Sequence, residues 1–392
     1  MKILSAFHLF AILLLTGCSS IPNIRSTASV PTESPANAPQ MEYVEVCEKP
    51  AACRKLSRLI LGTDHIGKRS SSEVTELLNE AVKFGINTFD TAPIYSDSIE
   101  QRLGDWLAAH PELFVITKGG FPRDLGPGTY SSRLKETREQ IIENISEEIR
   151  GSSSRLNNAI TIYLMHRDDA DFEDFEKIKR PQTPVRTILE ALSDPALRTQ
   201  YMMMGVSNWD TQRVNQSQSE ARRDKQLVRP VCNSPYFSLL EMGSVTIHSG
   251  GVQVKHAEMM NPAFQKGVNI MPYSPLGGFS ILSVGWDKAK QNALDLKNRG
   301  DRYWGHVYDA IFHEANEKRY RRATHFTDVF NDKHHTRYTV DQILNAYVLA
   351  HRRADFLIIG PTTVAQLRRT VEALRISKML TEEDLDYLYE NG

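Results

Sequence analysis

Short apolar runs alternate with helical patterns along most of this chain. Eight of the runs have the length of β-strands. Between them, apolar residues recur at helical spacing, as at Val74, Leu77, Leu78 and Ala81. The predicted strands span residues 58–66, 86–91, 113–118, 160–166, 202–208, 228–236, 268–274 and 356–360. The predicted helices span residues 70–84, 99–109, 131–150, 184–192, 211–223, 253–266, 340–352 and 364–375.

Eight strands that alternate with helices predict an α/β fold, the (β/α)8 TIM barrel. The alternative is an open doubly wound sheet. No predicted strand is followed by Gly-x-Gly-x-x-Gly at the start of a helix, which favours the barrel. A chain of 392 residues can form one such barrel with insertions. We therefore assign residues 41–392 to a single barrel domain, in which an N-terminal β-hairpin at 41–57 closes the bottom.

A long connection follows the seventh predicted strand. Residues 277–338 are polar and charged, with scattered aromatic residues. Connections of this length at the C-terminal face of a barrel are usually functional or contain helices of their own. We expect a partly helical lid over the mouth of the barrel. Its basic run at 318–322 is typical of a solvated helix face, and contact with an anionic cofactor or substrate is the alternative.

Polar residues stand at or just beyond the C-terminal ends of three successive predicted strands. Asp90 belongs to the second, Lys118 ends the third and His166 ends the fourth, while Tyr95 follows Asp90 by five residues. In a barrel these strand ends converge on one mouth. A single buried histidine or lysine is usually structural, but this set of four predicts a functional site.

These residue types suit the reduction of a carbonyl group. Hydride transfer to the carbonyl carbon places negative charge on the oxygen, so an acid must deliver a proton there. A phenol with its ordinary pKa of about 10 is a poor donor, and a nearby ammonium lowers that pKa. We expect Tyr95 to be the proton donor, Lys118 to lower its pKa and Asp90 to pair with Lys118. His166 would hydrogen-bond the substrate oxygen.

The motifs around these residues resemble those of the aldo-keto reductase family over about residues 41–380. The resemblance implies a (β/α)8 barrel that reduces aldehydes and ketones with NADPH, without a metal or flavin. The most specific motifs are Phe89-Asp90-Thr91-Ala92 with Tyr95, Thr117-Lys118, Leu164-Met165-His166, Gly205-Val206-Ser207-Asn208-Trp209, Pro272-Tyr273-Ser274-Pro275-Leu276-Gly277 and Ile358-Ile359-Gly360-Pro361.

The resemblance also implies cofactor contacts. Ser207 and Asn208 would bind the nicotinamide carboxamide, and Tyr273 would stack on the nicotinamide ring. The family resemblance implies NADPH as the cofactor. Asn233 stands where the family usually has Gln, and Gln366 stands where a basic residue for the 2'-phosphate is common, so NADH stays open as the alternative. The remaining predicted cofactor contacts are Ser274, Leu276, Gly277, Gly360 and Thr363.

The pocket walls cannot be assigned from motifs in the same way. We expect them from His65, Arg167, Trp209 and the aromatic residues of the 277–338 insertion. None of these residues identifies the substrate beyond a small carbonyl compound.

The N-terminus differs from the rest of the chain. Lys2 precedes an apolar run at 6–15 that is too short to span a bilayer but has the length of a signal-peptide core. The run ends in Leu15-Thr16-Gly17-Cys18, which resembles the lipobox of bacterial lipoproteins. We predict a signal peptide at 1–18, lipid on Cys18, a flexible tether at 19–40 and a location on the bacterial cell envelope, facing the periplasm or the exterior. The alternatives are a buried N-terminal helix and a cytoplasmic protein.

Composition adds little to this picture. The net charge is −1, and nothing marks a nucleic-acid binder. Cys47 and Cys53 could form a disulfide, Cys232 should be buried and inert, and no Cys/His spacing predicts a metal site.

Two other functions are alternatives to the reductase. One is a cofactor-binding sensory or regulatory module on the same barrel, comparable to the beta subunits of potassium channels. The other is a barrel hydrolase, which would need a metal cluster or a pair of carboxylates that the strand ends do not offer.

Overall fold

The computed structural model describes residues 38–49, 52–95, 98–121, 123–126, 129–131, 137–157, 159–168, 183–243, 245–247, 250–277 and 281–390. The predicted signal peptide, the predicted lipidation site Cys18 and nearly all of the predicted tether lie outside these residues. Within the described ranges, none of the helices combines the length and the apolar character that a membrane crossing requires.

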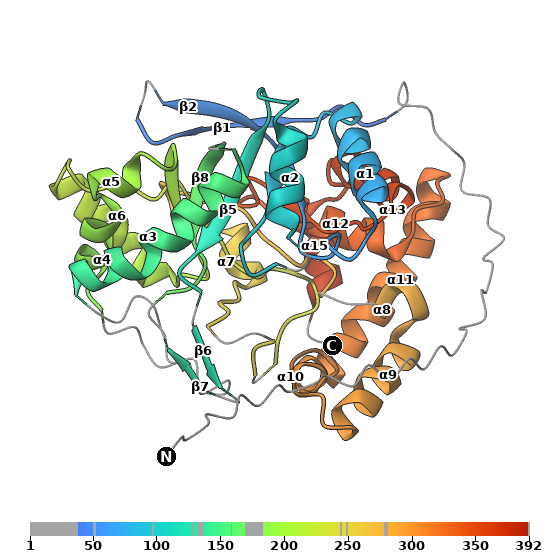
Figure 1. Cartoon of the computed structure of the whole chain (residues 1–392). Coiled ribbons are helices and arrows are strands. Elements are labelled where there is room, and N and C mark those ends of the chain that lie inside the picture. Colours follow the sequence, from blue (N-terminus) through green and yellow to red (C-terminus); the bar gives the residue numbers. More distant parts are fainter. Residues whose placement is uncertain are drawn as a thin grey trace, which may run out of the picture.

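Eight parallel strands form the centre of the molecule (Figure 1). They are β3 (Leu59–Gly62), β4 (Thr88–Asp90), β5 (Phe114–Gly119), β8 (Ile160–Met165), β9 (Met203–Ser207), β10 (Cys232–Ser234), β11 (Asn269–Ile270) and β12 (Leu357–Ile359). From β3 to β11 each strand pairs with the next strand of the barrel, and β12 pairs with β3. The backbone nitrogen of Phe356 donates to the Ile270 carbonyl over 3.1 Å, and that of Ile358 donates to the Pro272 carbonyl over 2.9 Å. These bonds join the last strand to the seventh, so the sheet closes as the predicted (β/α)8 barrel requires.

The N-terminal hairpin covers one end of this barrel, at the top of Figure 1. Strands β1 (Tyr43–Cys47) and β2 (Cys53–Ser57) are antiparallel, and a Cys47–Cys53 disulfide closes their turn. Val46 and Leu56 are fully buried in an apolar cluster with the inward-facing residues of the barrel strands. Cys232 belongs to the same cluster, and burial raises the pKa of its thiol, as expected of an inert cysteine.

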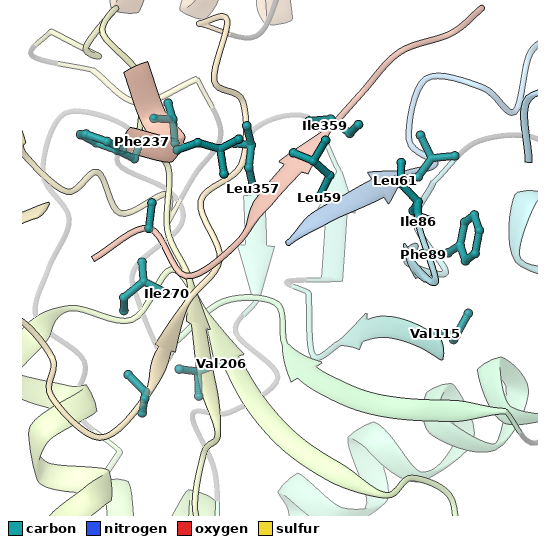
Figure 2. Packing of buried hydrophobic residues seen from close by; sticks show 14 of the residues in the cluster. Leu59, Leu61, Ile86, Phe89, Val115, Val206, Phe237, Ile270, Leu357 and Ile359 are labelled. Atoms are coloured by element: carbon teal, nitrogen blue, oxygen red, sulfur yellow. The ribbon is translucent and has the colours of Figure 1, made fainter. Parts of the chain in front are cut away.

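A second apolar layer separates the strands from the surrounding helices. Figure 2 shows Leu59 and Leu61 of β3 close to Leu357 and Ile359 of β12 in this layer. Helix α1 begins at a capping box between Ser70 and Glu73, as its Ser-rich start predicts. The helices around the barrel are α1 (Ser71–Lys83), α2 (Ile99–Leu107), α3 (Arg138–Arg155), α4 (Val185–Leu192), α5 (Pro195–Arg198), α6 (Thr211–Arg223), α7 (His256–Met260), α12 (Val340–Ala350), α13 (Val364–Val371) and α14 (Ala373–Ile376).

Several element boundaries differ from the prediction. The helix expected at 253–266 is only α7, because Pro262 cannot continue a helix and the side chain of Asn261 accepts from the Ala263 nitrogen instead. The helix expected at 131–150 begins at Arg138. A hairpin of β6 (Arg123–Gly126) and β7 (Thr129–Ser131) occupies part of the predicted loop before it. The C-terminal helix α15 (Glu382–Tyr389) was not predicted.

The segment after β11 is more helical than expected. It contains α8 (Ile281–Val284), α9 (Trp286–Asn298), α10 (Arg302–Ile311) and α11 (Glu314–His334). Trp286, Val307 and Ile311 pack against Tyr236 and Leu240, which follow β10. Figure 1 places α9 and α10 at the end of the molecule opposite the hairpin, which is the end at which a lid would lie.

The basic run in α11 is only partly a solvated face. Arg321 is exposed and pairs with Glu317 over 2.8 Å. Arg319 is 3% exposed and donates to Glu241 over 3.1 Å, so its charge is used inside the fold. Tyr389 of α15 also donates to Glu241, over 3.2 Å, and this joins the C-terminal helix to the segment after β10.

A histidine pair joins the C-terminal helix to two further helices. His256 Nδ1 lies 2.9 Å from His351 Nε2, and His256 Nε2 lies 2.9 Å from Asp386 Oδ1. His351 also contacts the Tyr347 carbonyl over 2.7 Å. Burial of His351 lowers its pKa from 6.5 to about 3.

This shift makes the stability of the protein pH-dependent. The unfolded chain protonates His351 below pH 6.5, whereas the folded chain does so only near pH 3, so the stabilisation is complete above pH 6.5 and is lost as the pH falls toward 3. Between pH 6.5 and pH 3 we expect this residue to lower the free energy of unfolding by about 1.4 kcal/mol for each unit by which the pH decreases. Urea unfolding measured at pH 6.5 and at pH 5 should show that the free energy of unfolding decreases less for His351→Phe than for the wild type. The exposed-residue control His65→Gln should keep the wild-type dependence, and equal pH slopes for His351→Phe and the wild type would refute the assignment.

Candidate active site

Three of the four predicted catalytic residues are in direct contact. Strands β4 and β5 are neighbours in the sheet, and both Asp90 and Lys118 lie at their C-terminal ends and are buried. The Lys118 ammonium donates to Asp90 Oδ1 over 2.5 Å, to the Tyr95 hydroxyl oxygen over 2.9 Å and to the Thr91 carbonyl over 3.1 Å. The ammonium is therefore held between the carboxylate and the phenol.

His166 lies beside this group, directly after β8. Its backbone nitrogen donates to the Gly119 carbonyl over 2.8 Å, which fixes the strand end relative to β5. Its ring meets the Tyr95 ring edge to face with centroids 6.2 Å apart, and the Phe121 ring with centroids 5.0 Å apart. The structure thus gathers all four predicted residues at one end of the barrel.

The electrostatics of Tyr95 differ from the sequence expectation. Burial raises the pKa of Tyr95 well above 10, and the charges of Asp90 and Asp64 raise it further, while Arg167 lowers it. The expected lowering by Lys118 does not dominate, because burial of the phenol is the largest effect on its pKa. Burial also raises the pKa of Asp90, and Lys118 opposes that rise. Tyr95 is thus a protonated hydrogen-bond donor over the ordinary pH range.

A buried carboxylate, Glu100, binds the residue that precedes Lys118. Glu100 of α2 accepts from the Thr117 hydroxyl over 2.5 Å, from the Ser152 hydroxyl over 3.1 Å and from Arg155 Nε over 2.8 Å. These bonds tie β5 to α2 and α3. Sequence reasoning assigned no role to Glu100, although its place five residues after Tyr95 was a usable signal.

The residues expected at the nicotinamide carboxamide form one hydrogen-bonded group. Ser207 donates to the Ser234 carbonyl over 2.9 Å, and Asn208 Nδ2 donates to Ser207 over 2.9 Å. The Tyr273 hydroxyl donates to Asn208 Oδ1 over 2.8 Å. This places the predicted stacking residue and the predicted carboxamide residues together, at the ends of β9, β10 and β11.

One buried acceptor lies on β10, directly before Ser234. Asn233 Nδ2 donates to the Trp209 carbonyl and to Gln265 Oε1, each over 3.0 Å. Within the part of the chain that the structure describes, Asn233 Oδ1 has no hydrogen-bond partner, although the residue is fully buried. A buried acceptor without a donor is costly, and the amide N–H of a carboxamide would satisfy it. The buried side chains at these strand ends therefore fit a nicotinamide carboxamide.

Backbone conformation is unusual at the same strand ends. Asn208 and Ser274 have positive φ angles, 59° and 56°. Side chains other than glycine rarely adopt this region, and such residues concentrate at functional sites. Gly277 has φ 73°, and a Cβ there would lie 3.0 Å from the Leu240 side chain. Leu276 is partly buried beside it.

The residues expected at the adenine end lie in the loop after β12 and at the start of α13. Gly360 is exposed. Thr363 caps α13 by accepting from the Gln366 nitrogen over 3.2 Å, and Gln366 Oε1 accepts from the Thr362 nitrogen over 2.7 Å. Arg369, the positively charged residue three positions after Gln366, lies 3.5 Å from Asp341. The roles of these residues toward a cofactor stay predictions.

The expected pocket walls are only partly correct. Trp209 is fully buried, with its ring below the guanidinium of Arg213, so it is core and not pocket wall. Arg167 does lie at the mouth. Its guanidinium is 5.1 Å from the Phe121 ring centre, and its positive charge lowers the pKa of Tyr95 and of Tyr273. Phe121 was missed, because it stands in a Gly- and Pro-rich stretch without strand or helix periodicity.

Comparison with known proteins identifies the family. Residues 58–390 match the model of the aldo/keto reductase family. The chain is similar to the uncharacterized oxidoreductase YrpG of Bacillus subtilis, with 27% identity over 82% of this chain and 89% of the relative. It is also similar to a putative aryl-alcohol dehydrogenase of Schizosaccharomyces pombe, with 23% identity over 86% of this chain and 92% of the relative. A 6-dehydroglucose reductase of Novosphingobium aromaticivorans is 26% identical over 58% of this chain and 67% of the relative. The chain is an oxidoreductase that belongs to the aldo/keto reductase family.

Proposed function

We propose that this protein reduces an aldehyde or ketone to the alcohol, with NADPH as hydride donor and Tyr95 as proton donor. The observation that carries this proposal is the contact of the Lys118 ammonium with both Asp90 and the Tyr95 hydroxyl. The group formed by Ser207, Asn208 and Tyr273 at neighbouring strand ends supports a nicotinamide beside it. Relatives named as oxidoreductases and reductases agree with this reaction type.

The proposed reaction balances without a metal. A bound reduced nicotinamide would supply a hydride to the carbonyl carbon. The C=O π electron pair then moves to the oxygen, the O–H bond of Tyr95 breaks, and its proton goes to that oxygen to complete the alcohol. An alkoxide is a stronger base than a phenolate, so Tyr95 can donate despite its raised pKa. Lys118 and Arg167 stabilise the phenolate until solvent returns the proton, and His166 orients the carbonyl oxygen.

Purified protein without residues 1–18 tests this proposal. NADPH oxidation is followed at 340 nm with a panel of aldehydes and ketones, and NADH is compared as cofactor. We expect turnover that depends on the carbonyl compound. Tight NADPH binding by fluorescence with no turnover of any carbonyl would favour the cofactor-binding regulatory module, and the absence of both binding and turnover would refute both functions.

We further propose that the mature protein is anchored to the bacterial cell envelope through lipid on Cys18. The apolar run before Leu15-Thr16-Gly17-Cys18 supports this location. The Cys47–Cys53 disulfide supports it as well, because disulfides persist mainly in oxidising compartments. Mass spectrometry of the membrane fraction should find diacylglyceryl on Cys18, and a Cys18→Ser protein should lose it. An unmodified, full-length chain in the cytoplasm would contradict the proposal.

A further inference from the structure

Two buried histidines bind each other and the C-terminal helix. His256 of α7 and His351, directly after α12, are 7% and 2% exposed. His351 Nδ1 lies 2.7 Å from the Tyr347 carbonyl, His351 Nε2 lies 2.9 Å from His256 Nδ1, and His256 Nε2 lies 2.9 Å from Asp386 Oδ1 of α15. His256 Nδ1 is also 3.1 Å from the Tyr347 hydroxyl. The two rings thus form a chain of contacts from a backbone carbonyl to a carboxylate.

These contacts fix the number of protons on the two rings. A carbonyl and a carboxylate only accept hydrogen bonds, so His351 Nδ1 and His256 Nε2 must each carry a proton. Asp386 is ionised, because 70% of its side chain is exposed to water. A third proton must lie between the facing nitrogens, since two lone pairs 2.9 Å apart would repel each other. Two neutral imidazoles hold one such proton each, so the pair holds one more and is positively charged.

The positive charge belongs to His256. Burial lowers the pKa of His351 to about 3, so that ring is neutral over the ordinary pH range. The Tyr389 ring of α15 stacks on the His256 ring with centroids 4.5 Å apart, and an aromatic face attracts a cation. On this count His256 is an imidazolium that contacts α15 twice, through the Asp386 carboxylate and through the Tyr389 ring.

Charges on the neighbouring elements pair with one another. Glu241, after β10, accepts from Arg319 of α11 over 3.1 Å and lies 3.1 Å from the Lys255 ammonium, next to α7. Arg352, after α12, donates to Glu382 of α15 over 2.9 Å. These ion pairs leave the extra proton of the histidine pair to the carboxylate that the pair itself contacts.

Helix α15 is also joined to α11. Arg319 Nε donates to the Tyr389 carbonyl over 3.3 Å, and its guanidinium lies 4.5 Å from the Tyr389 ring centre. Leu385 and Leu388 of α15 are buried. The C-terminal helix is thus fastened to the histidine pair and also to the last helix of the 277–338 insertion.

The bond between His256 and Asp386 lasts only while the third proton is bound. When that proton leaves, a nitrogen lone pair faces a carboxylate oxygen and the attraction becomes a repulsion. We propose that the histidine pair and Asp386 form a pH-sensitive latch, which holds α15 in place while the pair is charged and loosens α15, and its hold on α11, as the pH rises. The latch does not depend on the proposed reductase function. Its sign is opposite to the effect of His351 alone, which destabilises the folded chain as the pH falls.

NMR of protein labelled with ¹⁵N-histidine tests the proton count. The protein without residues 1–18 is titrated from about pH 6 to about pH 9, and His256→Gln and His351→Phe assign the two rings. At the acid end we expect three ring protons on the pair, two of them on His256. Two neutral rings throughout the titration would overturn the inference.

Hydrogen exchange measures the helix itself. Amide protection of α15, corrected for the intrinsic exchange rate at each pH, should fall about tenfold or more over the same pH step in which His256 loses its proton, as the loss of a charge-assisted hydrogen bond predicts. Helix α1 is the internal control and should keep its protection. An equal fall in α1 and α15 would show general unfolding instead of a latch, and unchanged protection of α15 would refute the latch directly.

Asp386→Asn removes the charge of the latch but keeps an oxygen that can accept from His256 Nε2. We expect α15 in this variant to exchange about tenfold faster at about pH 6 and to lose most of its pH dependence. Glu390→Gln is the matched control, because it removes one carboxylate from the exposed end of the same segment, and it should behave as the wild type. A wild-type pH dependence in Asp386→Asn would assign the effect to another group and end the proposal. If Asp386→Asn does not fold, the two wild-type titrations decide the question.

Discussion

Replacing Tyr95 by phenylalanine should lower kcat for aldehyde reduction about 10²- to 10⁴-fold, the usual contribution of a positioned general acid. The phenylalanine ring keeps the contact with the His166 ring but has no proton to give and no hydroxyl to accept from Lys118. The structure predicts little change in the binding of NADPH, because the Ser207, Asn208 and Tyr273 group is untouched. Single-turnover rates and fluorescence titration with NADPH measure the two quantities.

Tyr201→Phe is the matched control for this change. Tyr201 is also buried, and its hydroxyl donates to the Leu192 carbonyl over 2.7 Å, in a turn that precedes β9 and so lies away from the mouth. Losing this bond should cost about 1 kcal/mol of stability and leave kcat unchanged. An undiminished kcat in Tyr95→Phe would end its assignment as the proton donor.

Replacing Lys118 by methionine should remove both activity and stability. The substitution leaves the Asp90 carboxylate buried without its ion-pair partner, a loss that typically costs about 3–5 kcal/mol. The folded protein avoids part of this cost by protonating Asp90, whose pKa burial already raises. We expect urea denaturation to show the destabilisation at pH 7 and a smaller one at pH 5, where protonation is easier.

A double variant separates the two effects of this ion pair. Asp90→Asn with Lys118→Met removes both charges, so most of the lost stability should return. Reductase activity should not return, because the phenolate formed at Tyr95 would still lack its neighbouring ammonium. The exposed pair Arg321 and Asp287 serves as the control, and Arg321→Met should leave both stability and activity close to wild type. Recovery of activity in the double variant would show that Lys118 acts only on folding.

The sequence alone determined the scaffold and brought together the four residues predicted to be catalytic. Alternating strand and helix periods predicted eight parallel strands, and such strands all end on the same face of a barrel. Asp90, Lys118 and His166 stand at the ends of three neighbouring strands, so the fold brings them close together at that face. Hydrophobic period and position along a strand are local properties, which is why the sequence shows them directly.

Tertiary structure decided how these residues behave. Burial raises the pKa of Tyr95 against the sequence expectation, and packing makes Trp209 core instead of pocket wall. The hydrogen bond of Thr117 to Glu100 and the place of Arg167 near Tyr95 depend on neighbours far apart in the chain. Desolvation and charge interactions depend on every group packed around a residue, so only the assembled fold sets their direction.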